Sequence, residues 1–104
     1  MKISSTWAFL ITAAMLDASV GLAADISSGE QIARRWCASC HLVATDQLQA
    51  STEAPPFATV ARKPDFDTNR LAFFLLEPHP KMPNMSLTRS EAADIAAYIA
   101  SLAK

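Results

Sequence analysis

The sequence predicts a small all-α domain of roughly three to four helices, and three observations support this. Two segments, beginning at Ser27 and at Thr88, each place a glutamate three residues after a hydroxyl residue, which is the capping-box pattern of a helix start. Apolar residues recur at helical spacing after both starts, and again in the segment after Asp67. The chain after residue 24 has no clear run of alternating β-branched residues, so nothing in it indicates a sheet.

The first 24 residues are predicted to be a secretory signal peptide, because a basic start is followed by an apolar run and then by small residues. Cleavage after Ala23 or Ala24 would leave a mature domain at residues 25–104. The alternative is an uncleaved membrane anchor. However, the apolar run from Trp7 to Leu16 is shorter than the roughly 20 residues that span a bilayer, and an aspartate ends it. We therefore expect an exported, periplasmic protein with no membrane span in its mature form.

Length and charge restrict the possible functions. A mature domain of about 80 residues forms only a marginal hydrophobic core and needs an additional source of stability. The 9 Lys and Arg residues nearly balance the 10 Asp and Glu residues, so the formal net charge is −1. Because the sequence has no basic patch, it does not predict a nucleic-acid-binding protein.

The first helix is expected to have Ser27 as its N-cap, in a capping box with Glu30, and to run into Cys37. Apolar side chains recur within it at helical spacing, at Ile32, Ala33 and Trp36. Gly29 costs about 1 kcal/mol of helix stability relative to alanine. This glycine either permits another element to approach closely or lies in a frayed first turn.

Cys37-Ala38-Ser39-Cys40-His41, directly after this helix, has the spacing of a c-type haem attachment site. If the segment is helical, Cys37 and Cys40 lie one turn apart on one face, so both sulfurs can form thioethers with one porphyrin edge. His41 could then supply an axial nitrogen to the iron. The alternative is a thioredoxin-like dithiol, but that motif expects a βαβ pattern, which is not seen here. A covalently held porphyrin would also supply the additional stability that so small a domain needs.

A polar stretch at residues 42–53 is expected to form a surface loop. Pro55 and Pro56 follow it, and because proline cannot donate a hydrogen bond, their extended segment leaves carbonyl groups free to accept. A free carbonyl near His41 would suit its Nδ1–H, as second-shell partners do for metal-bound histidines. A plain rigid turn is the alternative.

A short helical turn is expected at residues 57–61, followed by a second clear helix that Asp65 or Asp67 caps and Pro78 ends. This second helix has a broad apolar face, which is typical of a helix that packs on a core. Its members are Leu71, Phe73, Phe74, Leu75 and Leu76.

The next segment, residues 78–85, contains three prolines and is expected to be a stiff, extended loop. A stiff loop suits a thioether ligand, since a methionine–iron bond is weak. The loop offers four groups to a sixth coordination position, and these are Met82, Met85, His79 and Lys81. The alternative for either methionine is to fill a gap in the core.

The last helix is expected from Thr88 to the end of the chain, with Thr88 and Glu91 as its capping box. It is amphipathic and rich in alanine, so it could pack closely against Gly29 of the first helix. Tyr98 lies on or near its apolar face, and we expect its hydroxyl to reach water.

Together these features resemble a small, monohaem class I cytochrome c over residues 25–104. Four signals stand in the family's order, namely Gly29, the Cys37–His41 motif, Met82-Pro83 and a terminal helix with Tyr98. The resemblance implies the small cytochrome c fold, in which the helices surround one covalently attached haem c and the first and last helices cross. Gly29 and Tyr98 resemble the contact pair at that crossing.

The resemblance also implies roles at the site. Cys37 and Cys40 resemble the thioether pair, and His41 resembles the proximal iron ligand. Pro55 is similar in place to the family's proline whose carbonyl receives the histidine Nδ1–H. Because the family's sixth ligand is commonly a methionine followed by proline, the candidates rank in the order Met82, Met85, and then His79 or Lys81.

A member of this family is implied to be a non-catalytic, one-electron carrier. Its donor would be a dehydrogenase or a quinol-oxidising complex, and its acceptor an oxidase or reductase. Three alternatives stay open from the sequence: a haem enzyme, a gas-binding sensor with a labile sixth ligand, and a dedicated electron-transfer subunit of a dehydrogenase. Arg34, Arg35, Lys63 and Lys81 are candidates for the rim of a docking surface, with a solvated surface as the alternative for each.

Overall fold

The computed structural model describes residues 23–77 and 80–104. Within these ranges the chain forms four α-helices and no β-strand, so the predicted all-α class is confirmed. The helices are α1 (Ile26–Trp36), α2 (Phe57–Ala61), α3 (Thr68–Leu76) and α4 (Arg89–Ser101). The predicted signal peptide up to residue 22, the helix stop at Pro78 and the candidate ligand His79 lie outside the described residues.

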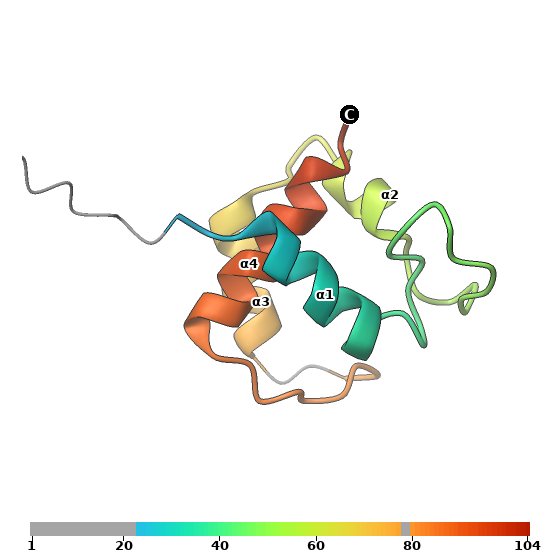
Figure 1. Ribbon diagram of the computed structural model, residues 1–104, viewed down its shortest axis with the longest axis horizontal. Helices are drawn as coiled ribbons and strands as arrows, with labels where there is room; N and C mark the ends of the chain where they lie inside the picture. The colour runs from blue at the N-terminus through green and yellow to red at the C-terminus, as the bar shows by residue number, and fades with distance from the viewer. Residues whose placement is uncertain (1–22, 78–79) are drawn as a thin grey trace, which may run out of the picture.

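Helix α4 is the centre of the fold, because it contacts each of the other three helices. Figure 1 shows α1 and α4 crossing in the middle of the molecule, with α3 below them and α2 beside the C-terminal end of α4. Two long loops extend from these helices, at residues 37–56 and at residues 80–88. None of the described helices is long and apolar enough to cross a membrane.

The crossing of α1 and α4 depends on Gly29. This glycine is buried, and a Cβ atom placed on it would lie 2.0 Å from the carbonyl oxygen of Asp94. The close-approach interpretation of Gly29 is therefore confirmed, and the frayed-turn alternative is wrong. Small and branched apolar residues pack around the contact and are at most 2% exposed, namely Ala33, Ala92, Ile95, Ala96 and Ile99.

The N-cap of α1 is Asp25, so the prediction of Ser27 is wrong. The Oδ1 atom of Asp25 accepts a hydrogen bond from the Ser28 amide at 3.1 Å, and the Asp25 amide donates to Oδ1 of Asp94 at 2.8 Å. Glu30 does not complete a capping box, since its carboxylate accepts from the guanidinium of Arg34 at 3.0 Å. The cap at Asp25 therefore begins the helix two residues earlier than the sequence pattern indicates.

The other two predicted caps are present. The side chain of Asp67 accepts from the Arg70 amide at 2.8 Å and begins α3. Thr88 and Glu91 form a complete capping box, in which the Thr88 amide donates to Glu91 at 2.9 Å and the Glu91 amide donates to Thr88 at 3.1 Å. This hydrogen bonding lowers the pKa of Glu91, since it favours the carboxylate form.

Two further expectations need correction. The hydroxyl of Tyr98 is turned inward and donates to the carbonyl of Val43 at 2.5 Å, whereas we expected it to reach water. The apolar face of α3 is only partly used: Leu71 and Leu75 pack against the core, but Phe73 is 66% exposed. Part of the apolar face of α3 therefore lies outside the core that the polypeptide forms.

Candidate haem-binding site

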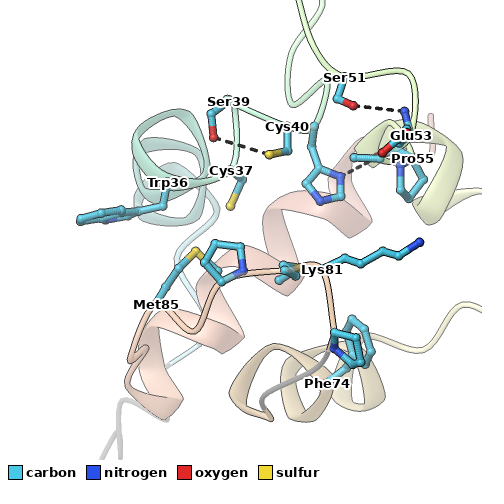
Figure 2. A pocket seen from close by; sticks show the side chains of 15 residues that line it. Trp36, Cys37, Ser39, Cys40, Ser51, Glu53, Pro55, Phe74, Lys81 and Met85 are labelled. Carbon is cyan, nitrogen blue, oxygen red and sulfur yellow. Dashed lines mark hydrogen bonds between the residues drawn. The ribbon is translucent and has the colours of Figure 1, made fainter.

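A cavity of about 330 Å³ lies between the end of α1, the proline segment and the loop that precedes α4 (Figure 2). Its lining includes every predicted site residue that the structure describes, namely Cys37, Cys40, His41, Pro55, Met82 and Met85. These residues come from three segments that are far apart in the sequence. The fold thus gathers into one place the groups that the sequence offers for binding haem.

The two cysteines lie in a turn that continues directly from α1. Cys37 is the C-cap of the helix, and its carbonyl accepts hydrogen bonds from the amides of Cys40 at 3.1 Å and His41 at 2.8 Å. The turn is therefore the helix-like turn that the motif requires for both sulfurs to serve one ligand edge. Neither cysteine is in a disulfide; Cys37 is buried and Cys40 is exposed.

The environments of the two sulfurs differ. Burial, with a smaller contribution from the nearby Cys40, raises the pKa of Cys37 to about 11. In the unmodified chain this sulfur is consequently a neutral thiol at neutral pH. The oxygen of Ser39 lies 3.8 Å from the Cys40 sulfur, at the exposed end of the turn.

His41 is held on one side by the proline segment. Its Nδ1 atom lies 2.7 Å from the carbonyl oxygen of Pro55. Because a carbonyl can only accept, Nδ1 carries the proton in this contact, and the lone pair of Nε2 is left available for a metal. The contact between His41 and Pro55 that the resemblance implied is thus present.

Phe57 packs against the same imidazole, and the sequence analysis did not single it out. The ring centroids of His41 and Phe57 are 5.1 Å apart, with the planes tilted by 45°. Phe57 is buried, and its amide donates to the Leu42 carbonyl at 3.0 Å. The position directly after two prolines was the available signal, since it makes Phe57 the first residue of α2.

The loop that precedes α4 brings both methionines to the cavity. Met85 also packs against the core cluster, which matches the gap-filling alternative for this residue. Met82 is half-buried and lines the cavity. Lys81, which has a φ of 73°, lines the cavity as well, but in Figure 2 its side chain runs away from the cysteines. Lys81, Met82 and Met85 thus all line the same cavity.

The rim of the cavity is partly apolar and partly charged. Trp36 is 57% exposed and Phe74 is 48% exposed, although both are large and line the cavity. Arg34 is engaged in ion pairs with Glu30 at 3.0 Å and Asp46 at 3.2 Å, so it ties the 42–53 loop to α1 and is not simply a rim cation. Arg35, Lys63 and Lys81 are exposed, which both the docking-rim and the solvated-surface interpretations expect.

The donor set fits a haem c. Two thiols one turn apart can attach to one porphyrin edge, and an imidazole with its Nε2 lone pair available stands directly beside them. Thioether sulfurs come from the opposite segment. The half-exposed Trp36 and Phe74 are the kind of wall that a large apolar disc would cover. In the part of the chain that the structure describes, no cluster of three or more His, Cys, Asp or Glu residues could hold a bare metal ion.

Comparisons with known proteins agree with this geometry. Residues 24–99 match the family model described as cytochrome c oxidase, cbb3-type, subunit III. A curated relative, cytochrome c-552 of Bradyrhizobium diazoefficiens, is 58% identical over 93 residues, which cover 89% of each chain. No solved structure matched the chain.

Proposed function

This chain belongs to the cytochrome c family and is an electron carrier with covalently bound haem c, and we propose that His41 and Met82 are the two axial ligands of its iron. The observation that carries this proposal is the cavity that brings Cys37, Cys40, His41 and Met82 together. In this assignment the two cysteine sulfurs form the thioethers. Pro55 fixes the tautomer and ring plane of His41 through its carbonyl.

The residues that hold the site explain how it would carry electrons. Haem c supplies a centre that accepts and releases one electron. His41 is fixed by Pro55 and Phe57, and Met82 belongs to a proline-rich segment, so the ligands need little rearrangement between the two oxidation states. As an iron ligand, the soft sulfur of Met82 would favour the reduced state and raise the potential. If His41 and Met82 both bind the iron, no coordination position would remain for a substrate, and we infer that the protein is not an enzyme.

Redox-partner proteins follow from the family. We propose a dehydrogenase or a quinol-oxidising complex as donor and an oxidase or reductase as acceptor. With a net charge of −1, long-range electrostatic steering is weak, so docking would depend on apolar contact near the cavity edge. Trp36, which is 57% exposed beside Cys37, is the apolar side chain best placed for this contact. The comparisons do not favour the haem-enzyme and gas-sensor alternatives.

We also propose that residues 1–24 are a signal peptide and that the mature domain, residues 25–104, works in the periplasm. The amide nitrogen of Asp25 lies 2.8 Å from Oδ1 of Asp94. If cleavage follows Ala24, that nitrogen becomes an α-ammonium group, and the contact becomes a charge-assisted hydrogen bond. Cleavage after Ala23 would leave it an ordinary amide contact.

Visible spectra of the exported holoprotein test the ligand assignment, with Met82→Leu and Met85→Leu as a matched pair. Ferric wild type should show the weak band near about 700 nm that reports sulfur–iron ligation. Met82→Leu should lose this band, whereas Met85→Leu should keep it. The intact mass of the same samples reports both the haem attachment and the cleavage site.

Two results would contradict the proposal. Loss of the band in Met85→Leu alone would transfer the ligand role to Met85. A wild-type protein without the band and with high-spin iron would have an open sixth position. The electron-carrier proposal would then be replaced by a ligand-binding or catalytic haem protein.

A further inference from the structure

The side chain of Gln47 makes an unusual set of contacts in the loop after the haem-binding motif. It is half-buried, and its Oε1 atom accepts a hydrogen bond from the Val43 amide at 2.9 Å. Its Nε2 atom lies within hydrogen-bond distance of three backbone carbonyl oxygens, those of Ala38 at 2.8 Å, His41 at 2.8 Å and Gln49 at 2.9 Å, and its two hydrogens are shared among them. One side-chain amide thus binds four main-chain groups, so both of its hydrogens and its oxygen are engaged.

These four groups belong to parts of the chain that have no regular secondary structure. Ala38 and His41 are in the turn after α1, Val43 follows that turn, and Gln49 lies further along the loop. Backbone groups in such a segment need partners, and here one amide supplies them. Such networks are stabilising when every member is satisfied. Gln47 therefore replaces the hydrogen bonds that a helix or sheet would otherwise provide around the motif.

His41 is consequently fixed at two separate points. Its imidazole is held by the Pro55 carbonyl at 2.7 Å, and its own carbonyl is held by Gln47 at 2.8 Å. The first contact orients the ring, but the ring can be held in place only if the main chain that carries it is also held. The second contact supplies this restraint from the opposite end of the residue.

We propose that Gln47 is a positioning residue for the haem ligand His41. This inference rests on the proposed function, because it assigns Gln47 a role through the ligand that the proposed function names. Gln47 clamps the Cys37–His41 turn to the following loop and so limits the movement of His41 relative to Pro55. Glutamine suits this place since it offers donors and an acceptor together, whereas glutamate lacks the donors and leucine lacks both.

The experiment compares Gln47→Leu and Gln47→Glu with Gln49→Leu in the ferrous holoprotein. Gln49 is the matched control, since it is an exposed glutamine in the same loop and contributes only its backbone carbonyl to the network. Solvent exchange is followed by NMR at two protons. The Val43 amide reports the lost bond to Gln47, and the Nδ1 proton of His41 reports how firmly the ligand is held. The reduction potential is measured in parallel across acidic and neutral pH.

In Gln47→Leu, both protons should exchange at least roughly fivefold faster than in wild type, which is the factor that one hydrogen bond of ordinary strength provides. Gln47→Glu should leave the Val43 amide protected, because the acceptor remains, and should speed exchange at the His41 proton. Its potential should fall below that of wild type at neutral pH and recover on acidification, because protonation removes the new charge and restores one donor. Gln49→Leu should match wild type in each measurement.

Faster exchange at Val43 with unchanged exchange at the His41 proton would overturn the proposal, because Gln47 would then brace only the loop. The proposal would also be overturned if both Gln47 variants failed to fold while Gln49→Leu folded normally. Gln47 would then be needed for the whole fold and not for the position of His41. Neither result bears on the proposed function, which is tested separately by the sulfur–iron band of wild type and the methionine variants.

Discussion

The crossing of α1 and α4 and the haem cavity are built in contrasting ways. At the crossing, the polypeptide is in contact with itself: Gly29 meets the backbone of α4, and Ile95 and Ala96 beside it are fully buried. At the cavity, large apolar side chains stay half-exposed, with Trp36 at 57% and Phe74 at 48%. The crossing is completed by the chain alone, whereas the cavity is a surface shaped for an apolar group that the chain does not supply.

The two regions are nevertheless joined at the helix ends. Cys37 is the C-cap of α1, and Thr88, the N-cap of α4, follows Met82 by six residues. The segment that carries Cys37 and His41 and the segment that carries Met82 are therefore each joined to one of the two helices that cross. The small residues packed at Gly29 therefore fix the helix from which the haem-binding turn continues, and Ala33 joins the two regions directly, because its carbonyl accepts a hydrogen bond from the Cys37 amide at 2.9 Å.

The sharpest way to break this arrangement is Gly29→Ala. The added Cβ would lie 2.0 Å from the Asp94 carbonyl oxygen, and since that atom belongs to the backbone it cannot rotate away. Overpacking costs about 1–3 kcal/mol, occasionally more. We expect about 3 kcal/mol of lost stability, even though alanine favours the helix by about 1 kcal/mol. Urea unfolding of the ferric holoprotein measures the loss.

The control for this variant is Gln31→Ala, an exposed position in the same helix. Glutamine already carries a Cβ atom, so alanine adds no clash there, and the stability should stay within about 0.5 kcal/mol of wild type. A Gly29→Ala protein as stable as this control would show that the two helices do not touch through their backbones.

Tyr98→Phe tests the contact that links the crossing to the cavity side. The hydroxyl of Tyr98 donates to the carbonyl of Val43, and Val43 is only 1% exposed, so phenylalanine leaves a buried acceptor without its partner. The expected cost is about 1–3 kcal/mol of unfolding free energy. Because burial raises the pKa of Tyr98, the folded state favours the neutral phenol. Wild type should therefore lose this contribution as the pH rises through the folded-state pKa, and the variant should not.

Thermal unfolding at neutral and alkaline pH measures both effects. Equal stability of Tyr98→Phe and wild type at neutral pH would mean that water replaces the lost donor at the Val43 carbonyl. In that case the loop would be held to the crossing by packing and by Gln47, without the phenol.

Much of the helical structure could be predicted from the sequence, because contacts between residues close in the chain determine where the helices begin. Asp67 and Thr88 cap their helices by contacts three residues away, which any folded version of the chain can form. The motif at Cys37–His41 likewise requires only one turn of helix. Ser27 failed as a cap because Asp94, from the far end of the chain, holds Asp25 in the competing position.

The site could be predicted only where a residue type is rare. Cysteine, histidine and methionine stand out in this chain, but Gln47 and Gln49 occur in the same polar loop with nothing to distinguish them. Only the folded loop turns one amide inward to four backbone groups and leaves the other outside. Positioning residues of this kind depend on the path of the main chain, which local sequence patterns do not determine.

The smallest expected effect is at the start of α4, where the methionine loop joins the crossing. Hydrogen bonds from the amide and hydroxyl of Thr88 lower the pKa of Glu91 in the folded state. The carboxylate therefore adds stability above its unfolded-state pKa and loses it as the pH falls through the folded-state pKa. Glu91→Gln keeps an acceptor but no charge, so it should be slightly less stable than wild type at neutral pH and equal to it near about pH 2.

Thermal melts of the ferric protein between these limits measure the difference, with Asp65→Asn as the control. Asp65 is an exposed carboxylate in a turn outside any helix start. If Glu91→Gln and Asp65→Asn change the pH dependence equally, the capping-box charge contributes nothing specific. A convergence with wild type at low pH that only Glu91→Gln shows would mean that acid weakens the helix start behind the methionine loop through the Glu91 carboxylate.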